Sequence, residues 1–392
     1  MSDKSIKNSN ISFLKKEEQV MLGVYKQLSL SIISAKGCEL ITNDNRKILD
    51  LYGGHAVMSL GYGEKNFLDS VKTQMTELLF QSNLLPLGIR ARAAENLIEI
   101  APDDLAKVFF VNSGSEANEN ALKIACLATG RKKILAVSHA FHGRTAASSA
   151  VTWNAKNSWY GFPAMPFDVE FIPRDDLSAA KNMINSKIAA VIVEPVQGVA
   201  GAYDLSSDFL RTIRQKCSDV SAILIVDEVQ SGMGRSGNYF AIQNYGIEPD
   251  ILTTAKSLGG GVPCAALMTT DYLSDYLKVG DLGSTFGGAP LACAAINAVI
   301  ESLSKNKLLQ NVKNKEIEIR KKCLLGPVQK IQGMGFLLGL VCDRPATEVQ
   351  AELLNRDILT GTSADRNVLR LLPPLILQSH HIDKLSDALA SI

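Results

Sequence analysis

Lys256 has the sequence setting that most favours a chemical role. It follows a mostly apolar run, residues 251–255, and precedes three consecutive glycines, with no acidic residue directly beside it. Removal from water disfavours the ammonium form of lysine, and an uncharged amine can form a Schiff base with a carbonyl group. An isolated lysine in such a flank is more often structural, so this interpretation depends on a second residue.

Asp227 is that second residue. It closes the apolar run 222–227, whose composition is typical of a buried parallel strand. A carboxylate at the end of a strand and a lysine on a later loop are what a pyridoxal phosphate enzyme requires. The carboxylate serves the pyridinium nitrogen and the amine binds the aldehyde.

A phosphate site is predicted where residues 108–112, a strand pattern, turn into a helix. Gly114 lets the backbone approach a ligand closely, and the hydroxyl of Ser115 and the free N–H groups of a helix start favour a dianion. An ordinary serine N-cap with Glu116 in the first turn would give the same pattern. The presence of the Lys256 and Asp227 candidates in the same chain favours the phosphate site.

The segment 139–144 offers two further side chains. Phe141 could stack on an aromatic cofactor, and Arg144 could bind a substrate carboxylate with two parallel hydrogen bonds. For His139 and His142, a structural role is at least as good an interpretation as a catalytic one.

The elements that must position these residues alternate between apolar strands and helical patterns, which predicts a mostly parallel sheet covered by helices. The expected strands cover residues 107–112, 133–137, 169–172, 188–194, 222–227 and 265–269. Glu194 ends one of them, so it should point to the same edge of the sheet as Asp227, where open α/β sheets bind ligands.

The two ends of the chain differ from this central part. The first ten residues are expected to form a loose tail, and residues 34–50 short strands with a turn at 43–45. Beyond residue 300 a lysine-rich helical stretch, 305–322, leads to apolar runs at 331–340 and 368–374, which predicts a small α+β lobe. We expect residues 1–55 to join that small domain, 56–300 to form a large cofactor-binding domain, and 301–392 to form the small domain.

The composition excludes several other classes of protein. The formal charge of +1 implies no nucleic-acid partner. No apolar stretch is long enough to span a membrane. The N-terminus is polar and lacks the apolar core of a signal peptide. The seven cysteines are scattered without a Cys-x-x-Cys pair, which favours free thiols in a reducing cytoplasm and no metal site.

The segment 232–237 fits the Gly-x-Gly-x-x-Gly pattern of dinucleotide-binding proteins. However, Asp227 and Glu228 lie between the strand and the glycines, where they would repel a pyrophosphate. Residues 238–240 do not begin a clear helix either. A dinucleotide site is therefore not expected.

Six motifs together resemble class-III pyridoxal-phosphate aminotransferases, and most closely the acetylornithine and succinylornithine aminotransferases. In chain order they are SGSEAN (113–118), FHGR (141–144), EPVQG (194–198), DEVQSG (227–232), AK (255–256) and GSTFGG (283–288). The resemblance extends from about Gly37 onward. It implies the type-I aminotransferase fold and a cytoplasmic homodimer with active sites at the subunit interface, working in arginine biosynthesis.

The matching positions imply the catalytic and phosphate-binding roles. Lys256 would carry the cofactor and then move a proton, while Asp227 would keep the pyridine nitrogen protonated. Gly114 and Ser115 would hold the phosphate together with the partner subunit's Thr285.

The same comparison implies that three side chains surround the cofactor ring. Phe141 would stack on one face, Val229 would pack on the other, and Gln230 would lie near the ring hydroxyl.

Four positions are implied to bind substrate. Arg144 would hold the carboxylate distal to the reacting amine, with Ser284 nearby, and Arg370 would receive the α-carboxylate of glutamate. Glu194 is the fourth substrate-site candidate. Relatives often carry a glutamate where this chain has Val199, and in related enzymes that glutamate can pair with the C-terminal arginine.

The predicted function is transfer of the δ-amino group of N2-acetylornithine to 2-oxoglutarate, which yields N-acetylglutamate 5-semialdehyde and glutamate. The alternatives are an N2-succinylornithine aminotransferase and an ornithine or other ω-amine aminotransferase. A cofactor-binding regulator with a degenerate site is the alternative outside the enzyme class.

Overall fold

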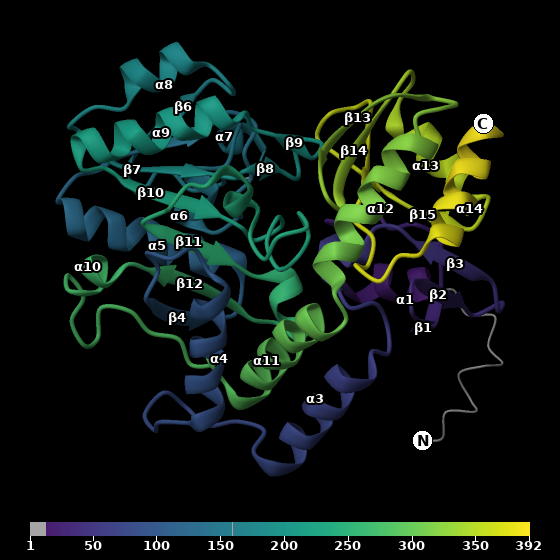
Figure 1. Ribbon diagram of the computed structural model, residues 1–392, viewed down its shortest axis with the longest axis horizontal. Helices are drawn as coiled ribbons and strands as arrows, with labels where there is room; N and C mark the ends of the chain where they lie inside the picture. The colour runs from purple at the N-terminus through teal and green to yellow at the C-terminus, as the bar shows by residue number, and fades with distance from the viewer. Residues whose placement is uncertain (1–12, 159) are drawn as a thin grey trace.

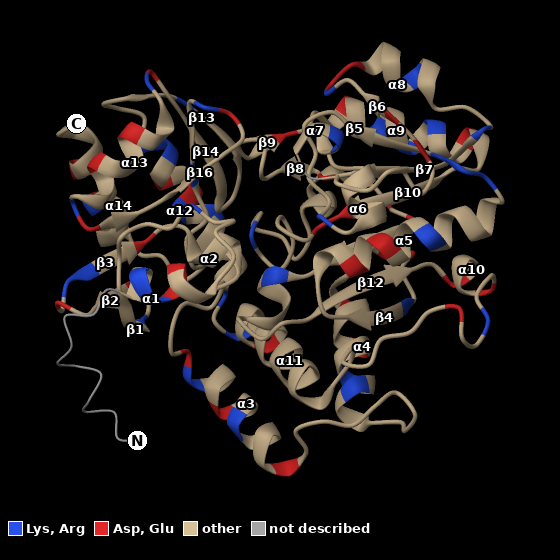
Figure 2. Cartoon of the chain, turned by 180° about the vertical axis from the view of Figure 1, so that it is seen from behind, with Lys and Arg blue, Asp and Glu red and all other residues tan. Residues whose placement is uncertain are grey.

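The computed structural model describes residues 13–158 and 160–392, which form two lobes (Figure 1). The loose tail expected for the first ten residues lies outside the described residues. Lysines, arginines and acidic residues are interspersed on helices of both lobes (Figure 2), in keeping with the formal charge of +1. In the part of the chain that the structure describes, no helix is long and apolar enough to cross a membrane.

The larger lobe is built on a seven-stranded sheet with the order β4-β12-β11-β10-β7-β5-β6. The strands are β4 (Lys107–Val111), β5 (Lys133–Val137), β6 (Asp168–Ile172), β7 (Ile188–Val193), β10 (Ile223–Asp227), β11 (Ile251–Thr254) and β12 (Ala265–Thr269). Strand β12 runs opposite to the other six, so its pairings with β11 and β4 are antiparallel and the remaining pairings are parallel. The predicted α/β class with a mostly parallel sheet is confirmed.

All six predicted strands are present, with ends that agree to within one residue. The prediction missed β11, the strand that immediately precedes the Lys256 segment. A run of four apolar and threonine residues is too short to reveal a period, and its conformation is fixed by pairing with β10 and β12 on either side.

Helices cover both faces of this sheet. They are α4 (Gly88–Ile100), α5 (Gly114–Thr129), α6 (Ala146–Ala150), α7 (Ala155–Ser158), α8 (Leu177–Met183), α9 (Ser207–Val220), α10 (Asp271–Ser274) and α11 (Pro290–Lys305), with the 3-10 helices η2 (Ala241–Tyr245) and η3 (Lys256–Gly259). Leu224 of β10 packs in the same core as Phe209 of α9, whereas the next residue, Ile225, packs in the core that contains Ile124 of α5. Successive strand residues point to opposite faces, so α5 and α9 lie on opposite sides of the sheet.

The C-terminal part forms the smaller lobe, with an antiparallel sheet in the order β13-β14-β17-β16. Its elements are β13 (Val328–Met334), β14 (Leu337–Cys342), β16 (Gly361–Thr362), β17 (Val368–Leu371), α12 (Leu308–Lys322), α13 (Ala346–Leu354) and α14 (Ser379–Ala390). The helix predicted from residue 305 to 322 was wrong at its start. Lys307 adopts a left-handed φ of 51°, so α11 ends before it and α12 begins after it.

The N-terminal segment lies beside the C-terminal lobe, as the purple and yellow elements of Figure 1 show. It contains α1 (Phe13–Val20), β1 (Ile32–Lys36), β2 (Glu39–Thr42), β3 (Lys47–Asp50) and α2 (Gly53–Ala56). The next helix, α3 (Lys65–Glu77), packs instead against α11 of the larger lobe (Figure 1). Strand β3 pairs in parallel with β15 (Ile358–Leu359). The turn predicted at 43–45 connects β2 and β3. The division into residues 1–55, 56–300 and 301–392 stays a prediction.

The glycine-rich segment 232–237 holds a buried arginine instead of opening an α-helix. Residues 229–240 form turns and bends. Earlier in the chain, β8 (Val196–Gln197) and β9 (Tyr203–Asp204) form a short hairpin. Arg235 has no exposed surface, and its guanidinium donates to the carbonyl oxygens of Pro373, Phe336 and Ala56. This one side chain links the larger lobe to the C-terminal lobe and to α2.

Replacing Arg235 should therefore weaken the fold. We expect Arg235→Met to lower the free energy of unfolding by about 3 kcal/mol or more, because each buried carbonyl left without a donor costs roughly 1–3 kcal/mol. Urea unfolding of the cofactor-free protein would measure this loss. Arg356→Met is the control, since Arg356 is exposed, and equal losses in the two variants would contradict the linking role.

Candidate active site

Pairing between β10 and β11 brings the two predicted catalytic residues to one edge of the sheet. Asp227, the last residue of β10, lies opposite Thr253 of β11, and Lys256 follows three residues later. Both border a cavity of about 410 Å³. Other predicted residues that line it are Gly114, Ser115, Phe141, Glu194, Val229 and Gln230, and Val199 lies there too.

Lys256 begins η3 in a left-handed conformation with φ 43°, which is costly for a residue with a side chain. The next residue, Ser257, is fixed by a 2.5 Å hydrogen bond from its hydroxyl to the carbonyl oxygen of Ala56. Burial lowers the pKa of Lys256 below the usual lysine value and Arg370 adds to this, whereas Asp227 and Glu194 oppose it. The site therefore makes the neutral amine easier to reach than it is for an exposed lysine.

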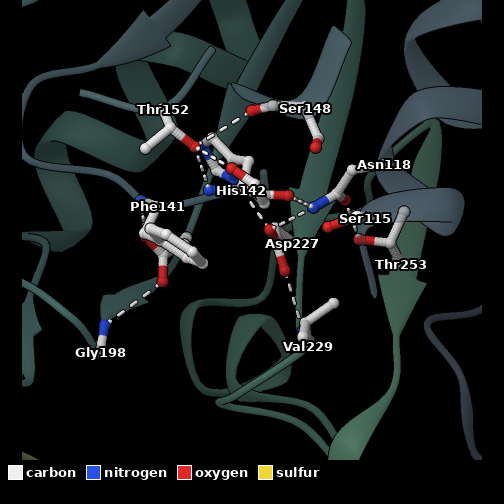
Figure 3. A network of polar contacts seen from close by, with 12 residues as sticks. Ser115, Asn118, Phe141, His142, Ser148, Thr152, Gly198, Asp227, Val229 and Thr253 are labelled. Atoms are coloured by element: carbon white, nitrogen blue, oxygen red, sulfur yellow. Dashed lines mark hydrogen bonds and ion pairs between the residues drawn. The ribbon is translucent and has the colours of Figure 1, made fainter. Parts of the chain in front are cut away.

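Asp227 is held by three donors from three segments (Figure 3). Its Oδ2 accepts hydrogen bonds from Nδ2 of Asn118 at 2.7 Å and from Nδ1 of His142 at 2.8 Å. Its Oδ1 accepts the backbone N–H of Val229 at 2.9 Å. The carboxylate is 3% exposed, so its charge is balanced chiefly by these hydrogen bonds.

The N-terminus of α5 has the form of an anion site. Ser113 is its N-cap and accepts a hydrogen bond from the N–H of Glu116, while the N–H groups of Gly114 and Ser115 have no acceptor within the helix. A Cβ at Gly114 would lie 2.8 Å from the Val229 side chain. Glycine is therefore required where the helix meets the floor of the cavity.

Glu194 supports two loops at the cavity wall. Its Oε1 accepts the N–H of Phe141 at 2.8 Å and its Oε2 accepts the N–H of Gly198 at 3.3 Å. Burial raises the pKa of Glu194 to about 7 and Asp227 adds to this, while His142 opposes it. Both oxygens are used within the protein, so these contacts give no support to the proposed direct role in substrate binding.

Arg370 lies next to the cavity, on β17 of the C-terminal lobe. Its guanidinium donates to the carbonyl oxygens of Thr362 at 2.7 Å and Gly198 at 3.2 Å, and to the Tyr52 hydroxyl at 2.9 Å. Arg370 forms no ion pair with any residue in the ranges that the structure describes. Its charge is thus held by neutral oxygen acceptors.

Besides Arg370, three predicted residues do not line the cavity of their own chain. Arg144 is exposed, with its guanidinium carbon 6.0 Å from the centroid of the Phe141 ring. Ser284 accepts hydrogen bonds from Nδ2 of Asn112 at 3.2 Å and from the N–H of Gly287 at 3.0 Å. Thr285 is exposed, and its implied place in the partner's site stays a prediction.

The cavity fits the phosphorylated pyridine that the sequence predicts. Two buried side-chain atoms of lining residues, Nε2 of His142 and Oε1 of Gln230, have no hydrogen-bond partner among the described residues. Buried polar atoms without partners are rare in folded proteins, so a polar ligand is expected against them. The amine, the carboxylate and the helix N-terminus border the same space.

Sequence reasoning left the roles of several residues unassigned. Asn118 stands inside the 113–118 motif, His142 was left between two interpretations, and Tyr52 gave no signal. The hydrogen bonds of Asn118 and His142 to Asp227, and of Tyr52 to Arg370, join residues 85 to 318 positions apart in the chain. Such contacts depend on the fold and cannot be read from local spacing.

Comparison with known proteins agrees with this geometry. The family described as aminotransferase class-III matches residues 23–392. The chain belongs to the class-III aminotransferases. This class-III aminotransferase is 36% identical to the acetylornithine aminotransferase of Methanocaldococcus jannaschii over 398 aligned residues, which cover 98% of each chain.

Two further relatives show how broad the similarity is. The LysW-aminoadipate semialdehyde/glutamate semialdehyde transaminase of Sulfurisphaera tokodaii is 35% identical, over 93% of this chain and 95% of that protein. The crystal structure of the ornithine aminotransferase of Toxoplasma gondii superposes with a TM-score of 0.91 at 25% identity, covering 99% of this chain and 96% of that chain. The protein is a pyridoxal-phosphate-dependent aminotransferase that acts on an amino donor and a 2-oxo acid.

The buried Glu228 next to Asp227 gives a prediction on pH and stability. Burial raises its pKa from 4.5 to about 7. Between these values only the folded state holds the proton, so its contribution to stability is complete below about pH 4.5 and falls by about 1.4 kcal/mol per unit as pH rises to about 7. Unfolding of the cofactor-free Glu228→Gln protein by urea, at about pH 5 and about pH 7, should show a smaller fall than in wild type. Glu99→Gln, at an exposed position, is the control, and an unchanged fall in Glu228→Gln would contradict the raised pKa.

Proposed function

We propose that this enzyme moves the δ-amino group of N2-acetylornithine to 2-oxoglutarate and forms N-acetylglutamate 5-semialdehyde and glutamate. The similarity to the acetylornithine aminotransferase of Methanocaldococcus jannaschii, over nearly the full length of both chains, carries the proposal. Lys256 borders the cavity and Arg370 lies close enough to influence its pKa, which supports the proposal because the reaction needs an amine and a receptor for carboxylates.

The residues of the chain would divide the work as follows. Pyridoxal phosphate, when bound, supplies an aldehyde and a ring that accepts electrons from the reacting carbon. Lys256 would bind that aldehyde and, once displaced by the substrate amine, would accept and return the proton of the reacting carbon. Asp227 would hold a proton at the ring nitrogen, and Gly114 and Ser115 would bind the phosphate through the α5 N-terminus.

The two arginines would each bind a different carboxylate of the substrate, according to where each arginine lies. Arg370 is 6% exposed and adjoins Gly198 and Val199, so it is suited to an α-carboxylate close to Lys256. Arg144 lies at the exposed side of the Phe141 ring, where the far end of a longer substrate would reach it. Ser284 would assist from the neighbouring loop.

A homodimer belongs to the same proposal, with the partner's Thr285 adding to the phosphate site. Apolar side chains are exposed near Thr285 in this chain: Phe286 is 62% and Leu84 87% exposed, and the Phe80 ring lies 5.3 Å from that of Phe286. Such a patch favours burial against a second copy. All seven cysteines are free, which supports work in a reducing compartment such as the cytoplasm.

A second candidate substrate is a LysW-linked semialdehyde, because the Sulfurisphaera tokodaii relative is named a LysW-aminoadipate semialdehyde/glutamate semialdehyde transaminase. The candidates would be distinguished by steady-state rates on acetylornithine, succinylornithine and ornithine with 2-oxoglutarate, and on LysW-linked aminoadipate semialdehyde with glutamate as the amino donor. The proposal requires the highest kcat/KM on acetylornithine and would be wrong if succinylornithine, ornithine or the LysW-linked substrate exceeded it.

The division between the arginines is testable by half-reaction. Arg370→Ala should slow the glutamate half-reaction at least about 30-fold, since loss of one partner of a buried charge pair costs about 2–5 kcal/mol. The acetylornithine half-reaction should change much less, because its α-carboxylate is far from the reacting amine. Single-turnover absorbance measurements would give both rates, and equal losses would contradict the assignment.

Val199 should influence the choice of acyl group. Because it follows Gly198, whose carbonyl accepts from Arg370, a carboxylate at this position would compete for that arginine and repel a succinyl carboxylate. We expect Val199→Glu to raise the preference for acetylornithine over succinylornithine about tenfold, or ~1.4 kcal/mol. Val199→Gln is the control of equal size, and the same change in both variants would mean that size and not charge decides.

A further inference from the structure

Asn118 is buried one helical turn after the phosphate-binding end of α5, and its amide has a single orientation. Its Nδ2 donates to the carbonyl oxygen of His142 at 2.8 Å as well as to Asp227 at 2.7 Å, and its Oδ1 accepts from the Thr253 hydroxyl at 2.7 Å. A carbonyl oxygen can only accept, so the amide nitrogen must face His142 and Asp227. Asn118 is 1% exposed and all of its contacts are to groups in or beside the site.

The contacts distinguish the two oxygens of Asp227. Oδ2 already accepts two hydrogen bonds, from Asn118 and from Nδ1 of His142, whereas Oδ1 accepts one, from the N–H of Val229. A carboxylate oxygen offers about two lone-pair positions, so the open one is on Oδ1. A ring nitrogen that carries a proton would therefore bind Oδ1.

The same helix thus fixes both ends of the cofactor site. Gly114 and Ser115, which border the cavity at the start of α5, precede Asn118 by four and three residues and share a helix face with it. Thr253, directly opposite Asp227 in the pairing of β10 and β11, holds the other side of the amide. One turn of α5 therefore sets the distance between the proposed phosphate site at Gly114 and Ser115 and the carboxylate of Asp227.

We propose that Asn118 is a positioning residue that holds Asp227 with Oδ1 toward the ring nitrogen of the cofactor and so keeps that nitrogen protonated. The proposal rests on the role proposed above for Asp227. A purely structural Asn118, which only joined α5 to β11, would contribute to stability without affecting the ring nitrogen. The two accounts therefore differ in a quantity that can be measured on the bound cofactor.

The test uses holoenzyme reconstituted with pyridoxal phosphate labelled with 15N in the ring. The 15N chemical shift reports the protonation of that nitrogen, and it is followed against pH in wild type, Asn118→Ala and Thr253→Val. We expect the ring nitrogen to lose its proton at lower pH in Asn118→Ala than in wild type, and to a smaller extent in Thr253→Val. Both half-reactions should slow about 10- to 100-fold in Asn118→Ala, the range found for residues that support a catalytic ligand.

Two controls make the outcome decisive. Asn120→Ala removes an amide from the same helix, where its Nδ2 donates to the carbonyl oxygen of Glu116, and should leave the 15N titration unchanged. Asp227→Ala should abolish the protonated form, and if it did not, the role of Asp227 and the present proposal would both fall. If Asp227→Ala behaves as expected while Asn118→Ala and Thr253→Val titrate as wild type, Asn118 is structural only. Should Asn118→Ala fail to fold, a wild-type titration in Thr253→Val alone would overturn the proposal.

Discussion

The site depends on the parallel pairing of β10 with β11. This pairing sets Asp227 opposite Thr253 and brings Lys256 to the same edge, so a buried carboxylate and a buried amine face one cavity. Neither group would be stable there alone, because a charge removed from water needs donors or an opposite charge. The hydrogen bonds on Asp227 and the lowered pKa of Lys256 are two responses to the same burial.

The remainder of the molecule can be understood as support for that edge. Helix α5 supplies the open N–H groups and Asn118, while the C-terminal lobe supplies Arg370. Arg235 links the two lobes by donating hydrogen bonds to backbone carbonyl oxygens. One of these, the carbonyl oxygen of Ala56, also accepts a hydrogen bond from the hydroxyl of Ser257, the residue after Lys256. The position of the amine is thus coupled to the contact between the lobes.

Three features could be predicted from the sequence because each has a local pattern. They are most of the large sheet, the helix after Ser113, and the combination of Lys256 with a carboxylate at the end of a strand. The strand β11 and the break at Lys307 were missed, since a four-residue strand and one left-handed residue give almost no periodic signal. Arg370 was suggested only by the family resemblance. The contacts of Asn118 and the orientation of Glu194 toward backbone N–H groups come from segments that meet only in the folded chain.

The central claim is that Lys256 is the residue that binds the cofactor covalently. Reduction of the holoenzyme with borohydride, followed by proteolysis and mass spectrometry of the peptides, tests it directly. The account predicts one stoichiometric phosphopyridoxyl adduct, on the peptide that contains Lys256. An adduct on another lysine, or none in a protein that turns over substrate, would contradict it.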